Sequence, residues 1–320
     1  MKYFVTGCGG FIGSNLVDRL LKDGHMVVGY DNFVTGNMQF LESAFQNKNF
    51  LLIIGDIHNT ELLNEAMNGC GFVFHLAANA DVRFGLNHPH KDLEQNTIST
   101  FYVLEAMREN GIKNIAFSST GSIYGEDTVF PTPERAPFPI QTSLYGASKL
   151  ACEGLIQAYC EGYDFKSWIF RFVSVLGERY SHGHLFNFYK ELYDGSDTLT
   201  VYGDGSQTKS YMHIQDCLDG MLIGIEKSNN KVNIFNLGTD ETIQVYDSIQ
   251  WVFEHFNREV MAKYSGGKRG WIGDSPLIYL NCNKIRELGW NPKYSIKDGV
   301  FNTLDYFDKN LWLMEVRGEQ

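Results

Sequence analysis

Short apolar runs alternate with longer amphipathic stretches through the first half of the chain. Phe11–Lys22 places Ile12, Leu16 and Leu20 along one helical face, and Asn96–Asn110 has the same helical spacing. The apolar runs have the length of buried β-strands and lie at Tyr3–Thr6, Met26–Tyr30, Phe50–Ile54, Val73–Leu76, Ile115–Ser118 and Ser167–Phe172. Strands that alternate with helices in this way predict βαβ units and a parallel sheet, so the expected fold class is α/β.

The alternation becomes less regular after about Arg171. Glycine- and aromatic-rich loops follow, with further helices expected at Leu218–Lys227 and Val245–His255. We therefore predict a first domain at residues 1–172 and a smaller α/β domain mainly at residues 173–320, with a segment near 211–238 returning to the first domain. No repeat, low-complexity tract or Ser/Pro linker separates the two, so we expect them to pack tightly.

A glycine-rich loop directly follows the first predicted strand. Gly7, Gly10 and Gly13 form the pattern G-x-x-G-x-x-G at the start of the first helix, with Phe11 and Ile12 between the last two glycines. Glycines at these positions allow the backbone to approach a pyrophosphate closely, and the helix N-terminus supplies unpaired N–H groups for the anion. The loop therefore predicts a dinucleotide-binding site.

Residues at the ends of the next strands extend this site. Asp31 follows the second strand, 18 residues after Gly13, where a carboxylate accepts hydrogen bonds from ribose hydroxyls and repels a 2′-phosphate. This position favours NAD over NADP. The other residues expected at the cofactor lie after further strands or on neighbouring helices, and they are Asn32, Asp56, Ile57, Leu76, Ala77, Ala78, Asn96 and Ser118.

A tyrosine and a lysine one helical turn apart carry the candidate chemistry. Tyr145 and Lys149 are related as i and i+4 and so share one helical face, while Thr120 follows the fifth strand. An ammonium group stabilises a phenolate and lowers its pKa from about 10, and the threonine hydroxyl can hydrogen-bond to the reacting oxygen. The trio suits proton transfer to or from an alcohol while a hydride moves to or from a nicotinamide, so Tyr145 and Lys149 are also expected at the cofactor.

These motifs, together with Gly55-Asp56, His75-Leu76-Ala77-Ala78 and Tyr124-Gly125, resemble the extended short-chain dehydrogenase/reductase superfamily. The resemblance is greatest to its nucleotide-sugar epimerases and dehydratases, typified by UDP-glucose 4-epimerase. It implies a doubly wound Rossmann domain that holds NAD, followed by a smaller domain for a nucleotide-diphosphate sugar. It also implies a homodimer built from the helices at Asn96–Asn110 and Tyr145–Glu161.

The resemblance further implies a reaction. In the family's 4-epimerases, the Tyr–Lys pair deprotonates the sugar 4-hydroxyl as C4 gives a hydride to NAD, and the 4-keto sugar then takes the hydride back on its other face. Family dehydratases carry an Asp-Glu pair directly after the threonine, whereas this chain has Gly121 and Ser122. We therefore favour a 4-epimerase of UDP-hexoses. A 4,6-dehydratase that uses Glu126, a 4-keto-sugar reductase and a non-enzymatic sensor are the alternatives.

The same resemblance implies a set of residues around the nucleotide sugar, namely Arg83, Thr120, Ser174, His184, Lys209, Arg269 and Asp274. Ser174 and Lys209 stand where the family has an Asn and an Arg against the diphosphate, and a lysine lacks the bidentate fork of an arginine. Arg269 is expected at the diphosphate and Asp274 at the ribose of the nucleotide.

Composition and charge exclude several other kinds of partner. The chain has 27 Lys and Arg against 38 Asp and Glu, a formal net charge of −11, which disfavours nucleic acids and anionic membrane surfaces. Its six cysteines form no C-x-x-C pair, and no signal peptide or membrane-length apolar run is present, so we expect a cytoplasmic protein. The sequences His88-Pro89-His90 and His182-Gly183-His184 lack a matched second ligand pair, so we expect no metal site.

Overall fold

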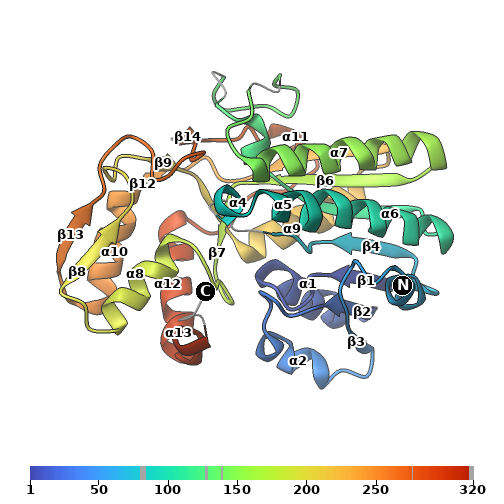
Figure 1. Cartoon of the computed structure of the whole chain (residues 1–320), viewed down its shortest axis with the longest axis horizontal. Helices are drawn as coiled ribbons and strands as arrows, with labels where there is room; N and C mark the ends of the chain where they lie inside the picture. The colour runs from blue at the N-terminus through green and yellow to red at the C-terminus, as the bar shows by residue number, and fades with distance from the viewer. Residues whose placement is uncertain (80–83, 127–128, 138–139, 276, 317–320) are drawn as a thin grey trace.

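The computed structural model describes residues 1–79, 84–126, 129–137, 140–275 and 277–316, and its largest feature is a seven-stranded parallel sheet (Figure 1). The strands are β1 (Lys2–Thr6), β2 (Met26–Asp31), β3 (Phe50–Ile54), β4 (Phe72–His75), β5 (Asn114–Thr120), β6 (Lys166–Phe172) and β11 (Val232–Leu237). Their order is β11-β6-β5-β4-β1-β2-β3, and all neighbouring pairs run parallel. Because the strand order reverses beside β1, the sheet is doubly wound, and the predicted α/β class and Rossmann architecture are confirmed.

Helices cover both faces of this sheet. The longer ones are α1 (Phe11–Lys22), α3 (Thr60–Met67), α6 (Ser99–Glu109), α7 (Leu144–Tyr163) and α9 (Ile214–Lys227). Successive strand residues point to opposite faces of the sheet and so belong to two apolar cores. Phe4 and Val73 pack with α3, α6 and α7, whereas Val5 and Phe74 pack with α1 and α9. Strands buried on both faces are typical of parallel sheets, which explains why the strand segments are continuously apolar rather than alternating.

Shorter helical segments connect these elements. They are η1 (Met38–Leu41), α2 (Glu42–Phe45), α4 (Phe84–Asn87), α5 (Pro89–Asp92), η2 (Leu93–Ile98) and η3 (Gly121–Tyr124). The helix predicted over Asn96–Asn110 is helical from Asn96 to Glu109, but the helical run begins earlier, because the π-helix η2 runs directly into α6. Single π-helical turns inside α-helices are frequently found at functional sites.

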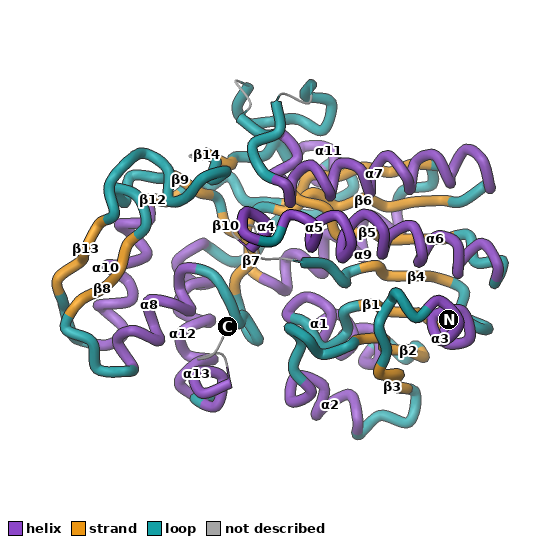
Figure 2. The backbone as a smooth tube through the Cα atoms, viewed as in Figure 1, coloured by secondary structure: helices purple, strands orange, loops and turns teal. Residues whose placement is uncertain are grey.

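The second half of the chain forms a smaller α/β lobe beside the sheet (Figure 2). Its strands are β7 (Ser174–Leu176), β8 (Thr198–Val201), β9 (Thr208–Lys209), β10 (Tyr211–His213), β12 (Ile243–Gln244), β13 (Met261–Tyr264) and β14 (Leu277–Ile278). Its helices are α8 (His184–Tyr193), α10 (Val245–Phe256), α12 (Ile296–Lys309) and α13 (Trp312–Val316), whereas α11 (Asn283–Arg286) lies against β11 of the large sheet. β11, from the segment expected to return to the first domain, is the edge strand next to β6.

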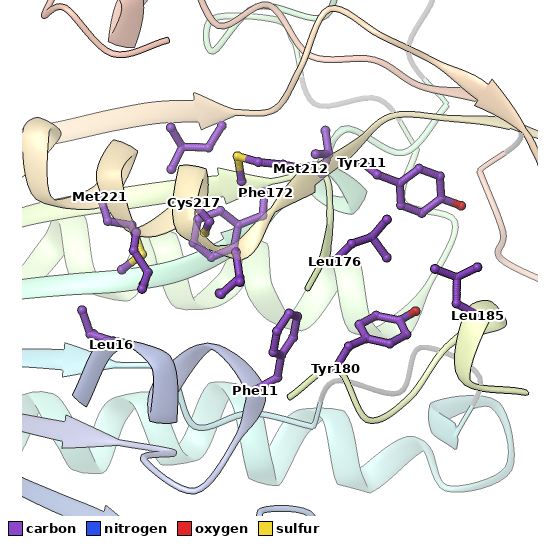
Figure 3. Close-up of a cluster of buried hydrophobic side chains, with 14 of the residues drawn as sticks. Phe11, Leu16, Phe172, Leu176, Tyr180, Leu185, Tyr211, Met212, Cys217 and Met221 are labelled. Atoms are coloured by element: carbon purple, nitrogen blue, oxygen red, sulfur yellow. The ribbon is translucent and has the colours of Figure 1, made fainter. Parts of the chain in front are cut away.

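One apolar core continues from the sheet into the smaller lobe (Figure 3). Phe11 at the start of α1 meets Tyr180 edge to face, with ring centroids 5.7 Å apart, and Leu185 on α8 belongs to the same core. Because α1 also carries the glycine loop, the lobe is packed directly against the predicted dinucleotide site.

All six cysteines are free and buried. No helix in the described ranges combines the length and apolar character needed to cross a membrane. The homodimer stays a prediction.

Candidate active site

The glycine loop joins β1 to α1 and leaves no room for a side chain at Gly7 or Gly13. Gly7 has a φ of +69°, and a Cβ there would lie 2.7 Å from the backbone nitrogen of Ala77. A Cβ on Gly13 would lie only 2.0 Å from the carbonyl oxygen of Gly7. Gly10, the N-cap of α1, has no side chain to cap the helix, and the first turn, which holds Phe11 and Ile12, contains no acidic residue. The helix N-terminus is therefore left for an external anion.

Asp31 ends β2 directly beside this loop. Its Oδ2 accepts a hydrogen bond from the Gly9 N–H at 2.8 Å, and its Oδ1 accepts one from the Phe33 N–H at 2.8 Å. Burial raises the pKa of Asp31, and these backbone hydrogen bonds oppose that rise. A carboxylate has about four lone-pair sites, so acceptor capacity remains for ribose hydroxyls.

Asn32 and Asp56 lie next to Asp31 in the predicted cofactor site, at the ends of β2 and β3. The Asn32 side-chain amide donates to Asp56 Oδ2 at 2.8 Å, and the His58 N–H donates to Asp56 Oδ1 at 2.9 Å. Burial raises the pKa of Asp56, but these hydrogen bonds outweigh it and the net shift is downward. Ile57 is buried beside them. The structure thus brings four of the predicted cofactor residues to one edge of the sheet.

The end of β4 is held by a buried hydroxyl and a neutral histidine. Thr6 Oγ1 accepts hydrogen bonds from the N–H groups of Leu76 and Ala77 at 3.1 and 3.2 Å. His75 bridges the hydroxyls of Thr6 and Thr100 through its two ring nitrogens, at 2.8 and 3.0 Å. Burial, with the Lys149 charge, lowers the pKa of His75 to about 3. These bonds fix the backbone that Ala77 presents against the glycine loop.

Tyr145, Lys149 and Thr120 converge where β5 ends and α7 begins. Lys149 Nζ donates to the carbonyl oxygen of Ser118 at 2.9 Å, which holds the ammonium under the end of β5. Burial raises the pKa of Tyr145, and a hydrogen bond with the Thr120 side chain opposes that rise. Burial also lowers the pKa of Lys149 to about 8, against opposing electrostatic effects of Cys152 and Glu153. The predicted trio is therefore assembled with the Lys149 ammonium buried and with Tyr145 and Thr120 partly exposed.

Asn96 lies in a polar network that the sequence did not reveal. Its side-chain amide donates to Ser148 Oγ at 2.9 Å, and its Oδ1 accepts the Asn79 N–H at 2.9 Å. Ser148 Oγ in turn donates to the carbonyl oxygen of Tyr145 at 2.8 Å. The π-helix is thus tied to the first turn of α7. The only sequence signal was an asparagine, because its partners lie 17 and 52 residues away.

A cavity of about 350 Å³ in the smaller lobe contains three of the predicted substrate residues, His184, Lys209 and Asp274. Lys209 Nζ donates to Asp274 Oδ1 at 2.7 Å, so these two residues of the cavity lining form an ion pair with each other. Burial lowers the pKa of Lys209, against the opposing effect of Asp274. Burial, with the Lys209 charge, lowers the pKa of His184 to about 4, so this imidazole is neutral near pH 7. The sequence did not single out Gln207 and Tyr211, which also line the cavity.

The other predicted substrate residues lie outside the lining of this cavity. Ser174 is exposed on β7. Arg269 is exposed and forms an ion pair with Glu126, which follows the Thr120 segment. Arg83 lies outside the described residues. The segment that carries Arg269 and Asp274 nevertheless approaches the end of η3, because Ser275 Oγ donates to the Gly125 carbonyl oxygen at 3.3 Å.

Residues 3–238 match the model of the NAD dependent epimerase/dehydratase family. The chain belongs to this family. A UDP-glucose 4-epimerase of Mycolicibacterium smegmatis is 30% identical over 322 residues, which cover 96% of this chain and 98% of that protein. The relatives of this family member thus include 4-epimerases that match it along their full length.

Two solved structures of the family have the same overall architecture. A UDP-glucose 4-epimerase from Thermotoga maritima with UDP-glucose is 32% identical, with a TM-score of 0.87 over 97% of this chain and 100% of the other. A UDP-glucuronic acid 4-epimerase from Bacillus cereus, in complex with UDP-glucuronic acid and NAD, is 28% identical, with a TM-score of 0.89 over the same shares.

NAD is the cofactor of this family, and the described residues fit it. The uncapped start of α1 matches the charge of a pyrophosphate, and the positions of Gly7 and Gly13 admit backbone but no Cβ. Asp31 provides a carboxylate at the distance along the chain typical of a ribose contact. The predicted cofactor is confirmed, whereas the role of each individual residue stays a prediction.

Proposed function

We propose that the chain is a UDP-hexose 4-epimerase that uses Tyr145 as its base. The observation that carries the proposal is the convergence of Tyr145, Lys149 and Thr120. The Thr120 side chain lies close enough to oppose the rise in the Tyr145 pKa, and the Ser118 carbonyl oxygen accepts a hydrogen bond from Lys149. Gly121 and Ser122 supply no carboxylate beside this trio. The 4-epimerases among the family relatives favour UDP as the nucleotide.

In this mechanism Tyr145 takes the proton of the sugar 4-hydroxyl, and Thr120 hydrogen-bonds to the oxygen that loses it. The Lys149 ammonium stabilises the phenolate from the next helical turn. When bound, NAD supplies the hydride acceptor for C4, the donor for the return step and a positive charge that lowers the pKa of the nearby phenol. The 4-keto sugar then rotates within the site, so that the opposite face of C4 is presented for the return of the hydride. Tyr145 returns the proton to the 4-oxygen in the same step. The hydrogen removed from C4 and the hydroxyl proton are both restored, so no external oxidant or reductant is consumed.

Elimination of water at C6 would require an acid and a base near the trio. The nearest candidate in the sequence was Glu126, and its carboxylate is engaged by Arg269. The dehydratase alternative therefore gains no support from the geometry.

A panel of nucleotide sugars tests the proposal. The protein is incubated with UDP-glucose, UDP-GlcNAc and the corresponding uronic acids without added cofactor, and the products are followed by NMR. We expect conversion of at least one substrate to its 4-epimer. Formation of 4-keto-6-deoxy sugars would indicate a dehydratase, a requirement for stoichiometric added NAD(P)H would indicate a reductase, and binding without turnover would indicate a sensor.

Lys209→Met is expected to raise the KM for the nucleotide sugar with little change in kcat. We propose that the Lys209 ammonium, now paired with Asp274, binds the substrate diphosphate. Loss of a hydrogen bond to a charged group is worth about 1.5–3 kcal/mol, or roughly 10- to 150-fold in affinity. Steady-state kinetics measure the change. Lys297→Met, which removes an exposed lysine paired with Glu254 on another surface, is the control, and an unaltered KM in Lys209→Met would exclude this role.

A further inference from the structure

A buried ion pair lies directly behind the predicted catalytic residues. Glu153 and Arg171 are only 1% and 2% exposed, and they form a two-pronged contact, Nη2 to Oε2 at 2.7 Å and Nε to Oε1 at 3.0 Å. Ser119 Oγ donates to the same Oε1 at 2.5 Å. The carboxylate therefore joins helix α7 to the two adjacent strands β5 and β6.

The positions of these residues in the chain place them against the trio. Tyr145, Lys149 and Glu153 follow one another at four-residue intervals on α7, so they share the helical face that meets the sheet. Ser119 immediately precedes Thr120 on β5. A single carboxylate thus links the helix that carries Tyr145 and Lys149 to the strand that carries Thr120 and the carbonyl that binds Lys149.

Arg171 extends the connection to the segment after Thr120. Its Nη1 donates to the Tyr124 hydroxyl at 2.7 Å and to the Glu134 carbonyl oxygen at 2.9 Å. The Tyr124 hydroxyl donates to Asn236 Oδ1 on β11 at 2.9 Å. Thr120 is therefore held from both sides, through Ser119 before it and Tyr124 after it.

Stability alone is a poor explanation for this arrangement. Desolvation of two charges offsets much of their attraction, and replacement of a buried ion pair by apolar residues of similar volume is often neutral or stabilising. Directional hydrogen bonds from a rigid guanidinium fork do, however, fix relative geometry in a way that apolar packing does not. Sub-ångström placement of reacting groups has a large effect on rate.

We propose that Glu153 is a positioning residue, which sets α7 against β5 through Arg171 and Ser119 so that Tyr145 and Lys149 meet Thr120. This inference rests on the proposed function for its effect on turnover. Its geometric content does not, because the Lys149–Ser118 contact can be measured directly in a structure.

Two variants test the inference. Ser119→Ala removes the link from the carboxylate to β5 and leaves the ion pair intact. The double variant Glu153→Leu with Arg171→Met replaces the ion pair by apolar side chains. If the pair served only stability, this replacement would preserve the fold and the parental activity. We expect both to bind substrate with nearly unchanged KM and to lose kcat, by several-fold for Ser119→Ala and by about 10²-fold for the double variant, the penalty typical of a 1 Å displacement. Ile156→Val, a buried change on the same helix outside the network, controls for general loosening of α7 and should keep the parent kcat.

Crystal structures of the variants give a readout that does not depend on activity. We expect the Lys149 Nζ to Ser118 oxygen distance, 2.9 Å in the parent, to lengthen or the contact to be lost. Retention of this contact with a parental kcat in either folded variant overturns the inference. If the double variant does not fold, Ser119→Ala decides alone. If the parent itself does not epimerise any substrate, the proposed function fails, and the structures still decide whether Glu153 positions the trio.

Discussion

Tyr145→Phe is expected to lower kcat by about 10²- to 10⁴-fold, the contribution typical of a positioned general acid–base group. The change removes one hydroxyl, the group that exchanges a proton with the sugar 4-hydroxyl in the proposed mechanism. The aromatic ring and its packing at the start of α7 remain. Substrate affinity should change little, because the diphosphate and nucleotide are proposed to bind through the smaller lobe. NMR assays of epimerisation and a binding titration with the same UDP-sugar measure the two effects separately.

Tyr163→Phe is the matched control for this variant. It makes the same chemical change on the same helix, at an end where the side chain is 46% exposed. We expect it to retain parental kcat. Turnover of Tyr145→Phe at more than about a tenth of the parental rate would show that another group serves as the base, since that loss lies well below the usual contribution of such a residue.

Gly13→Ala is expected to abolish retention of NAD. The new Cβ would lie 2.0 Å from the carbonyl oxygen of Gly7 and 2.8 Å from its carbonyl carbon. Backbone atoms cannot yield as a flexible side chain would, so either the loop or α1 must move. Movement of either element displaces the N–H groups that are proposed to bind the pyrophosphate. The amount of NAD released from purified, heat-denatured protein, measured by absorbance and chromatography, gives the result.

A second glycine distinguishes this local clash from a general effect of added methyl groups. A Cβ on Gly162, near the end of α7, meets nothing within 4 Å. Gly162→Ala should therefore keep parental NAD content, with a helix as stable as the parent's or more so. Circular dichroism establishes that both variants are folded. Parental NAD content in folded Gly13→Ala would mean that the cofactor does not use this loop.

Local patterns in the sequence predicted most of the sheet and its helices. The helix over Phe11–Lys22 and the strand over Phe50–Ile54 have the predicted bounds, because their apolar spacing and flanking glycines act over a few residues. The π-helix at Leu93–Ile98 was missed. It lies beside hydrogen bonds from Asn96 to Asn79 and Ser148, and side-chain contacts between distant segments leave no periodic signal in a sequence.

The site residues likewise divide into those predicted from local spacing and those whose partners are distant in the sequence. Tyr145 and Lys149 could be paired from their spacing on one helix, and the structure places both at the end of β5. Lys209 and Asp274 were each predicted as substrate residues, but their mutual hydrogen bond joins positions 65 residues apart. The contact of Arg269 with Glu126 spans 143 residues. Such partners depend on the tertiary fold, so the sequence predicted the charges and not their pairing.

The acidic chain, with its net charge of −11, binds small anions in this account through local features. At the glycine loop, an uncapped helix N-terminus with no acid in its first turn replaces a basic side chain. In the smaller lobe, Lys209 is a half-buried cation within the cavity lining. A negative overall field therefore remains compatible with two diphosphate groups, although it disfavours long polyanions.

The fate of the hydrogen on C4 tests the central claim most directly. A UDP-hexose that carries deuterium at C4 is incubated with the protein in ordinary water without added cofactor, and its products are examined by NMR and mass spectrometry. The proposed mechanism removes and returns the same hydride at one carbon, so it predicts the 4-epimer with deuterium still at C4. Deuterium lost to the solvent, or found on another carbon of a dehydrated product, would contradict it.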